Sequence, residues 1–467
     1  MNPLEIPPGE FERLCRKAER MAADYLQSLP SHAAFPATSG DQTERLFHQP
    51  WTDEGLGAGA LDAVRDVFEH SRPPSPCFFG YVFGSGEPVA AIGDLLASVV
   101  NQNVTAWRSA PAAVAIEKTV VGWLAEAVGA SGFSGSLCGG GSAANLMALA
   151  MAREARAPAN QRGAPAGVVY ASEEVHMSIP KSVALLGLGT ANLRLVATDE
   201  RFRMIPQQLE RVMEEDRHAG KLAIAVVASA GTVTTGSIDP LPEITEIGRR
   251  HGAWLHVDGA YGALAALAMT EKFAGLRLAD SLSLDPHKWL YQPVDVGCLL
   301  YRDGTAARAA FSHTGEYARV LNEDPVEGFA FFEESAELSR RFRALKLWLS
   351  LRYHGRAAFR AAIANDLKHA QLLAERVRHT PQLELMAPVE LSAVCFRYRR
   401  EGKSEAELDG LNRAILKRVV QRGRVFISNA LLRGRFALRA CIVNHRTTAA
   451  DVEKVVEEVL QSATETA

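Results

Sequence analysis

Lys288 is the residue whose surroundings most favour covalent chemistry. It lies in SLSLDPHKWLYQPVDVGCLLYR (281–302), in a turn that opens at Pro286 between two apolar runs expected to be buried strands. A lysine beside apolar strands is costly unless its charge is lost or paired, and a desolvated lysine is a nucleophile suited to imine formation with an aldehyde. A lone lysine is more often a solvated surface residue. Whether Lys288 forms an imine therefore has to be judged from the residues upstream.

Three upstream features supply complementary chemistry. Gly139, Gly140, Gly141 and Ser142 precede an expected helix, so their backbone N–H groups and the helix dipole suit a phosphate. Asp258 ends an apolar strand, AWLHVD, where a carboxylate can keep a ring nitrogen protonated. His176, which follows the strand GVVYAS, could lie flat on a ligand ring. Each feature alone is explained equally well by a turn, a cap or a packed loop residue.

Together these residues form a set with one chemical use. Pyridoxal phosphate needs an imine-forming lysine, a carboxylate for its pyridine nitrogen and a phosphate site. The chain presents all of these, and a histidine for ring stacking, in regions expected to end buried strands. Ligands of open α/β sheets bind at that edge. We therefore predict pyridoxal 5'-phosphate as the cofactor.

The elements that must position these residues alternate regularly. Apolar runs of strand length lie at 167–172, 193–198, 222–228, 253–258, 281–285 and 296–301, with helical stretches between most of them. This alternation predicts a mostly parallel sheet covered on both faces. Helices are also expected over 9–28, 59–70, 112–128 and 143–156, with an extended linker over 29–58. After residue 334 we expect helices over 335–354, 356–379, 404–422 and 449–463 and strand-like runs between them.

The chain resembles the group II pyridoxal-phosphate-dependent amino-acid decarboxylases, the family of aromatic-L-amino-acid, histidine and glutamate decarboxylases. HVDGAYG (256–262) and DPHKWL (285–290) are the most specific motifs; GSAANL (141–146), AGTVTTGSIDPL (230–241) and RRFRALKLW (340–348) add to them. The likeness runs from about Trp51 to the C-terminus, and it is greatest to the aromatic-L-amino-acid decarboxylases. It implies an α/β protein with the type I fold of PLP-dependent transferases, as in aspartate aminotransferase. We expect an N-terminal helical and extended segment (1–75) at a dimer interface, a large cofactor-binding domain (76–350) and a small C-terminal α+β domain (351–467).

The resemblance also implies roles for single residues. The catalytic set it implies is Lys288 as the imine lysine, Asp258 at the pyridine nitrogen, His176 stacked on the ring and Tyr317 as proton donor from a loop over 311–328. The cofactor-binding positions are Gly141, Ser142, His176, Thr232, Asp258, Ala260, His287 and Lys288. Thr232 and Thr234 remain alternatives for the family's threonine. Asp285 is left out, because a carboxylate that close to phosphate would repel it.

The activity implied is decarboxylation of an L-amino acid to an amine and carbon dioxide. Phe79, Tyr81, Phe83 and Trp107 could form a wall for an aromatic substrate such as tyrosine, dihydroxyphenylalanine or tryptophan. Asn103 and Thr105 stand where the aromatic-specific members carry bulkier apolar residues, which keeps glutamate, aspartate or 2,4-diaminobutyrate as alternatives. An aldehyde synthase goes with loss of the loop tyrosine, and Tyr317 is present. A transaminase is disfavoured by DPHKW, and an inactive scaffold by the intact Lys288.

Composition limits the partners. The 467-residue chain carries a formal net charge of −3 and shows no basic stripe, so a nucleic-acid partner is not expected. No uninterrupted apolar run is long enough for a membrane span, and no signal-peptide core is visible at the N-terminus. The six cysteines lack CxxC spacing, so we expect reduced thiols, no metal site and a cytoplasmic protein. Resemblance and the amphipathic helix over 9–28 predict a homodimer with active sites at the subunit interface.

Overall fold

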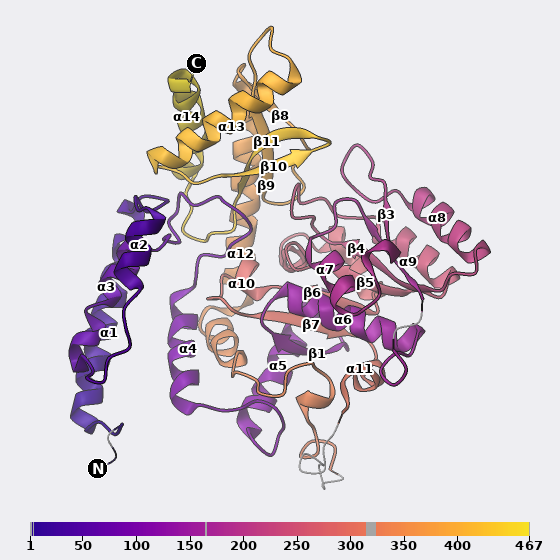
Figure 1. Cartoon of the computed structure of the whole chain (residues 1–467), viewed down its shortest axis with the longest axis horizontal. Helices are drawn as coiled ribbons and strands as arrows, with labels where there is room; N and C mark the ends of the chain where they lie inside the picture. The colour runs from indigo at the N-terminus through magenta and orange to yellow at the C-terminus, as the bar shows by residue number, and fades with distance from the viewer. Residues whose placement is uncertain (1, 3, 164–165, 314–323, 467) are drawn as a thin grey trace.

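The computed structural model describes residues 2, 4–163, 166–313 and 324–466, and a seven-stranded sheet forms the centre of its large domain (Figure 1). The strand order is β1-β7-β6-β5-β4-β2-β3. The strands are β1 (Ser134–Cys138), β2 (Val168–Ser172), β3 (Leu193–Val196), β4 (Ala223–Ser229), β5 (Trp254–Asp258), β6 (Ser281–Leu284) and β7 (Gly297–Tyr301). Strands β3, β2, β4, β5 and β6 pair in parallel, and β7 runs antiparallel to both β6 and β1. The predicted fold class is confirmed, with β1 as the strand that the sequence did not reveal.

Helices cover both faces of this sheet, which explains why its strands are apolar throughout. Val226 of β4 packs into the core with α5 (Pro111–Ala127), α8 (Pro206–His218) and α9 (Leu241–Arg250). The next residue, Val227, packs on the other face with α6 (Gly141–Arg156), α7 (Ser178–Leu185) and α11 (Gly304–Phe311). Successive strand side chains point to opposite faces, so a sheet covered twice needs apolar residues at every position.

A second, smaller sheet of four antiparallel strands lies at the top of Figure 1. Its order is β10-β11-β9-β8, with β8 (Leu383–Leu385), β9 (Ala393–Tyr398), β10 (Ser428–Leu432) and β11 (Arg435–Cys441). The helices α12 (Ala344–His379), α13 (Glu405–Arg422) and α14 (Ala449–Thr466) pack with it around a separate apolar core. The expected domain boundary at 350/351 lies inside α12, which continues through a kink at Gly355 with φ of 74°.

The helix predicted over 335–354 begins only at Ala344, and this part of the prediction was wrong. The reason is Arg340, whose side chain is buried and paired with Glu117 of α5. Its guanidinium also donates to the carbonyl oxygens of Val104 and Leu137, both at 2.8 Å. A helix through residue 340 would compete with these contacts, because its backbone N–H bonds instead to Oδ1 of Asn103.

The N-terminal helices form a column beside the large domain (Figure 1). It contains α1 (Pro8–Ser28), α2 (Gly40–Phe47) and α3 (Val64–His70). The predicted linker over 29–58 therefore includes a helix, which begins with a capping box between Ser39 and Gln42. A further helix that was not predicted, α4 (Pro88–Val100), follows. Among the described residues, no helix is long and apolar enough to cross a membrane.

Candidate active site

A cavity of about 340 Å³ opens at the carboxyl ends of the parallel strands. The turn after β1, the loops after β2, β4 and β5, and the short helix α10 (Pro286–Trp289) after β6 all contribute to it. Its lining residues are Gly139, Gly140, Gly141, Ser142, Asn145, His176, Ser229, Gly231, Thr232, Val233, Asp258, Ala260, Tyr261, Asp285, His287, Lys288 and Val294. Ligands are expected at this edge of an open α/β sheet.

The glycine turn forms a cradle at the start of α6. Gly140 adopts φ of 133°, a conformation that favours glycine. A Cβ atom on Gly141 would lie 2.6 Å from Cβ of Ala260, so a larger residue would fill the cradle. The N–H groups of Ala143 and Ala144 donate to the carbonyl oxygen of Gly140, both at 3.0 Å, whereas those of Gly141 and Ser142 precede the first of these bonds, and the helix dipole adds positive potential there. The turn therefore suits an anionic group.

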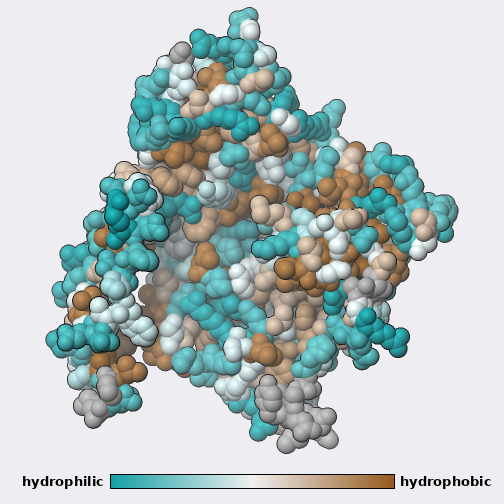
Figure 2. Space-filling model, viewed as in Figure 1, coloured by the Kyte–Doolittle hydropathy of each residue, from teal (hydrophilic) through white to brown (hydrophobic). Residues whose placement is uncertain are grey.

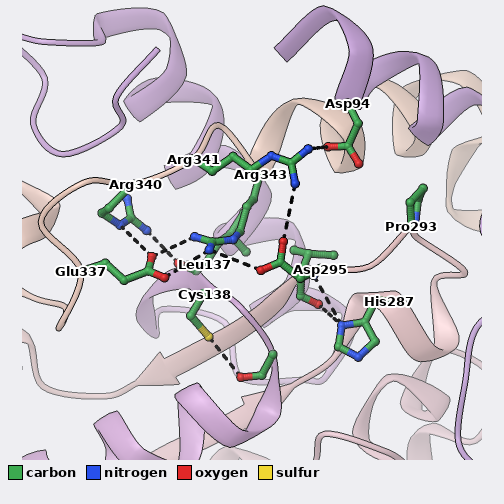
Figure 3. A network of polar contacts seen from close by, with 12 residues as sticks. Asp94, Leu137, Cys138, His287, Pro293, Asp295, Glu337, Arg340, Arg341 and Arg343 are labelled. Carbon is green, nitrogen blue, oxygen red and sulfur yellow. Dashed lines mark hydrogen bonds and ion pairs between the residues drawn. The ribbon is translucent and has the colours of Figure 1, made fainter. Parts of the chain in front are cut away.

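Charged side chains lie beside this turn, and Figure 3 shows Asp295 next to Arg341 and Arg343. Oδ2 of Asp295 lies 3.1 Å from the position a Cβ would take on Gly139, and Arg343 donates to the same carboxylate at 3.4 Å. Arg343 also donates to Glu337 at 2.8 Å. These bonds tie the segment after α10 to the start of α12. The cradle is therefore backed by groups that already neutralise one another.

Lys288 faces a carboxylate in the same cavity. Its Nζ lies 2.8 Å from Oδ2 of Asp285, the residue that precedes α10. Oδ1 of Asp285 is buried and has no hydrogen-bond partner among the residues that the structure describes. His287 Nδ1 lies 2.7 Å from the carbonyl oxygen of Val296, and burial lowers the pKa of His287, which favours the neutral ring. The unsatisfied oxygen of Asp285 leaves room for a donor on a bound ligand.

Asp258 is oriented by three donors. Its Oδ2 accepts from Nδ2 of Asn145 at 2.8 Å, and its Oδ1 accepts from Ser283 Oγ and from the backbone N–H of Ala260, both at 3.1 Å. A carboxylate held in this way remains an acceptor. On the cavity side it can accept a hydrogen bond from a protonated ring nitrogen.

His176 and one of the two candidate threonines also line the cavity. Burial lowers the pKa of His176, so its ring is held neutral. Thr232 lines the cavity, and its hydroxyl accepts from the backbone N–H of Ser237 at 3.1 Å. Thr234 is not among the residues that line the cavity, and its side chain instead bonds to Glu174. The geometry therefore favours Thr232 as the cofactor neighbour.

All eight predicted cofactor positions line the cavity, and sequence reasoning missed Asn145, Ser229 and the inward position of Asp285. A lone asparagine in the apolar helix segment AANLMALAMA was a usable signal. Tyr317 lies outside the described residues. The four predicted substrate residues do not line the cavity of this single chain: Phe79 is buried, Tyr81 is exposed, Phe83 packs near Phe78 and Trp107 packs on the large-domain core.

A family model described as the pyridoxal-dependent decarboxylase conserved domain matches residues 65–399. The chain belongs to this family. It is 36% identical to an aromatic-L-amino-acid decarboxylase from Bacillus atrophaeus, over 99% of this chain and 97% of that protein. It is 28% identical to a phenylacetaldehyde synthase from Petunia hybrida, over 94% of this chain and 91% of that protein. This decarboxylase is therefore a PLP-dependent carboxy-lyase of the group II family, as predicted.

Solved structures of related proteins have closely similar folds. A crystal structure of Oryza sativa TDC with PLP and tryptamine superposes with a TM-score of 0.92 at 27% identity, covering 100% of this chain and 99% of that one. Mouse CSAD gives the same TM-score at 26% identity, covering 98% and 99%. The fold is that of PLP-dependent decarboxylases.

The residues of the cavity fit pyridoxal phosphate. Gly140, Gly141 and Ser142 would hold the phosphate at the start of α6, Asp258 would face the pyridine nitrogen, and Lys288 would bond to the aldehyde carbon. The narrow cradle at Gly141 and the orientation of Asp258 by three donors are the observations that support this fit. When bound, the cofactor accepts the electron pair that departing carbon dioxide leaves behind.

Proposed function

We propose that this decarboxylase converts an aromatic L-amino acid to its amine and carbon dioxide. The observation that carries the proposal is the meeting of Lys288, Asp258 and His176 in one cavity, in a chain 36% identical to an aromatic-L-amino-acid decarboxylase over nearly its whole length. Lys288 supplies the covalent attachment. Asp258 keeps a proton on the ring nitrogen, and His176 packs on the ring as a neutral imidazole. These roles let the bound ring withdraw electrons from the substrate.

The polar residues at 103 and 105 do not weigh strongly against an aromatic substrate. The side-chain oxygen of Asn103 accepts from the backbone N–H of Arg340 at 2.8 Å, so its polarity already has a partner in the fold. A polar or acidic substrate remains the second candidate, since Asn103 and Thr105 replace apolar residues.

A panel assay separates these candidates. Purified protein is given L-tryptophan, L-tyrosine, L-dihydroxyphenylalanine, L-phenylalanine, L-glutamate, L-aspartate and 2,4-diaminobutyrate, and carbon dioxide and amine are both measured. We expect kcat/KM to be highest for an aromatic substrate and turnover to be lost in Lys288→Ala. Borohydride should fix the cofactor to the peptide that contains Lys288. Faster turnover of glutamate, or fixation on another lysine, would contradict the proposal.

We further propose a cytoplasmic homodimer whose active sites lie at the subunit interface. On α4, Ile92, Leu95, Leu96, Val99 and Val100 are each about half exposed, which is unusual for so many apolar side chains on one helix. An open gap separates the lower part of the N-terminal column from the body (Figure 2). The six cysteines are free thiols, in keeping with a reducing compartment.

The position of α4 relates this surface to the cavity. Gly84, four residues before α4, is so close to α10 that a Cβ atom on it would lie 2.2 Å from the carbonyl oxygen of His287. The chain therefore runs from the cavity wall directly into the apolar helix. A second copy packed on α4 would therefore lie near the cavity wall, beside the segment that carries the exposed Tyr81 and Phe83.

A further inference from the structure

The inner wall of the cavity contains a chain of polar side chains that reaches beyond the residues in contact with a ligand. On β5, His256 and Asp258 are two residues apart, so both point to the same face of the sheet. The register pairs His256 with Ser281 and Asp258 with Ser283 on β6. Helix α6 packs over this face and directs Asn145 between the two strand residues.

Asn145 is the junction of this chain. Its Nδ2 donates to Oδ2 of Asp258 at 2.8 Å and to Ser178 Oγ at 2.9 Å. Its Oδ1 lies 2.9 Å from Nε2 of His256. The side chain of Asn145 is buried, so all of its bonds are made inside the protein. Asn145 thus connects the carboxylate that faces the ring nitrogen with the loop that carries His176.

The hydrogen positions follow from Asp258. An ionised carboxylate only accepts, so the amide nitrogen of Asn145 must face it and the amide oxygen must face His256. Nε2 of His256 therefore carries the proton, and its Nδ1 accepts from Ser281 Oγ at 2.9 Å. Ser281 in turn accepts from Nε1 of Trp254 at 2.8 Å. Each donor in this series has one acceptor.

The hydrogen-bond partners of His176 determine the tautomer of its ring in the same way. The backbone N–H of Ser178 donates to Nδ1 of His176 at 3.2 Å, so Nδ1 carries no proton. Ser178 Oγ accepts from Asn145 and donates to Nδ1 of His176 at 2.8 Å. The proton of the neutral ring therefore lies on Nε2. Asn145 therefore bonds directly to Asp258 and, through the hydroxyl of Ser178, is connected to His176.

We propose that His256 and Asn145 are positioning residues that hold Asp258 as an acceptor for the protonated ring nitrogen. His256 is fully buried, and burial lowers its pKa to about 4, so it stays a neutral donor above that pH. A charged His256 would add a buried cation beside Asn145 and would compete for the carboxylate. This inference rests on the proposed role of Asp258.

The test compares two probes of the same shape. Apoprotein of the full chain is titrated with pyridoxal phosphate and with its analogue in which C–H replaces the ring nitrogen, and the ratio of the two dissociation constants is measured. Only the first probe can use the acceptor on Asp258. Loss of a positioning bond should lower the preference for pyridoxal phosphate, whereas general damage to the cavity should weaken both probes equally.

His256→Met removes the donor at similar volume, and we expect the preference to fall about tenfold. His256→Gln keeps a donor near the position of Nε2 and should retain the preference within about twofold. Ser281→Ala, which removes the hydroxyl that donates to Nδ1 of His256, serves as the second variant if the methionine variant does not fold, and it should lower the preference about threefold. Thermal unfolding of each variant reports on folding.

Asp258→Ala tests the role of Asp258 separately from the positioning role of His256 and Asn145. If it abolishes the preference while His256→Met and Ser281→Ala leave it at the wild-type value, the positioning role is wrong and the role of Asp258 stands. If Asp258→Ala leaves the preference unchanged, the proposed role of Asp258 is wrong. Equal weakening of both probes in the His256 variants would also overturn the inference.

Discussion

Nζ of Lys288 and Oδ2 of Asp285 lie 2.8 Å apart, so the nucleophile and a buried carboxylate share one wall of the cavity. The carboxylate also faces the phosphate cradle, since its Oδ2 lies 3.0 Å from the position a Cβ would take on Gly141. Asp285 therefore has two opposing effects. It stabilises the ammonium of Lys288 in the free protein, and it disfavours a phosphate dianion at the start of α6.

Asp285→Asn should therefore bind pyridoxal phosphate about tenfold more tightly, because one like charge near the phosphate is removed. Absorbance titration of the apoprotein measures the dissociation constant. Asp53→Asn removes the same charge from an exposed position and is the matched control. Unchanged or weaker binding in Asp285→Asn would show that its bond to Lys288 matters more than repulsion of the phosphate.

Tyr317→Phe should change the product. After carbon dioxide leaves, the substrate carbon must take up a proton, and a phenol with a pKa of about 10 can supply it. General acid catalysis contributes about a hundred- to ten-thousand-fold, so without the hydroxyl the reaction with oxygen can compete. We expect carbon dioxide release with much less amine, and peroxide in air. Wild-type amine yield without peroxide would mean that another group donates the proton.

Leu95→Glu should disrupt the proposed dimer, because a charge would be placed in the centre of the exposed apolar face of α4. Light scattering should give the mass of a monomer and activity should fall. Leu222→Glu, at another exposed leucine, should leave both unchanged. A Leu95→Glu protein with the mass of the wild-type dimer, or a monomeric wild type, would contradict the proposal.

Asp366 should make stability depend on pH. It is buried on α12, accepts from the hydroxyl of Tyr291 at 2.8 Å, and burial raises its pKa from 3.8 to about 8. Between these values the folded state binds the proton more tightly than the unfolded state, so this residue's contribution to stability falls as pH rises from about 4 to about 8.

Asp366→Asn should remove that dependence. An asparagine at this position carries no charge, and its side-chain oxygen can still accept from Tyr291. The variant should unfold at a higher temperature than wild type at pH 8.5, with a smaller difference at pH 5.5. Asp24→Asn, at an exposed position of α1, is the control. Parallel curves for wild type and Asp366→Asn across this range would refute the assignment.

Local patterns determined the fold class and most of the candidate site. Continuous apolar runs alternating with helices require a parallel sheet, and parallel strands bring their carboxyl ends to one edge. Asp258 and Lys288 could therefore be placed together before any contact was known. Strand β1 was not predicted, because its glycine and serine residues carry little apolar signal. Its backbone is held by a residue distant in the sequence, Glu117, whose carboxylate accepts from the N–H of Leu137 at 2.9 Å.

Only the tertiary structure decided which side chains pair across elements. Asn145 lies on α6, His256 on β5 and Ser178 on α7, and no sequence spacing shows that they share bonds. The sequence left Thr232 and Thr234 as alternatives; in the structure Thr232 lines the cavity, whereas the side chain of Thr234 bonds to Glu174. Periodicity reports which face of an element is buried. The partner of a buried polar group depends on the packing of distant segments, which the amino-acid pattern of one segment does not contain.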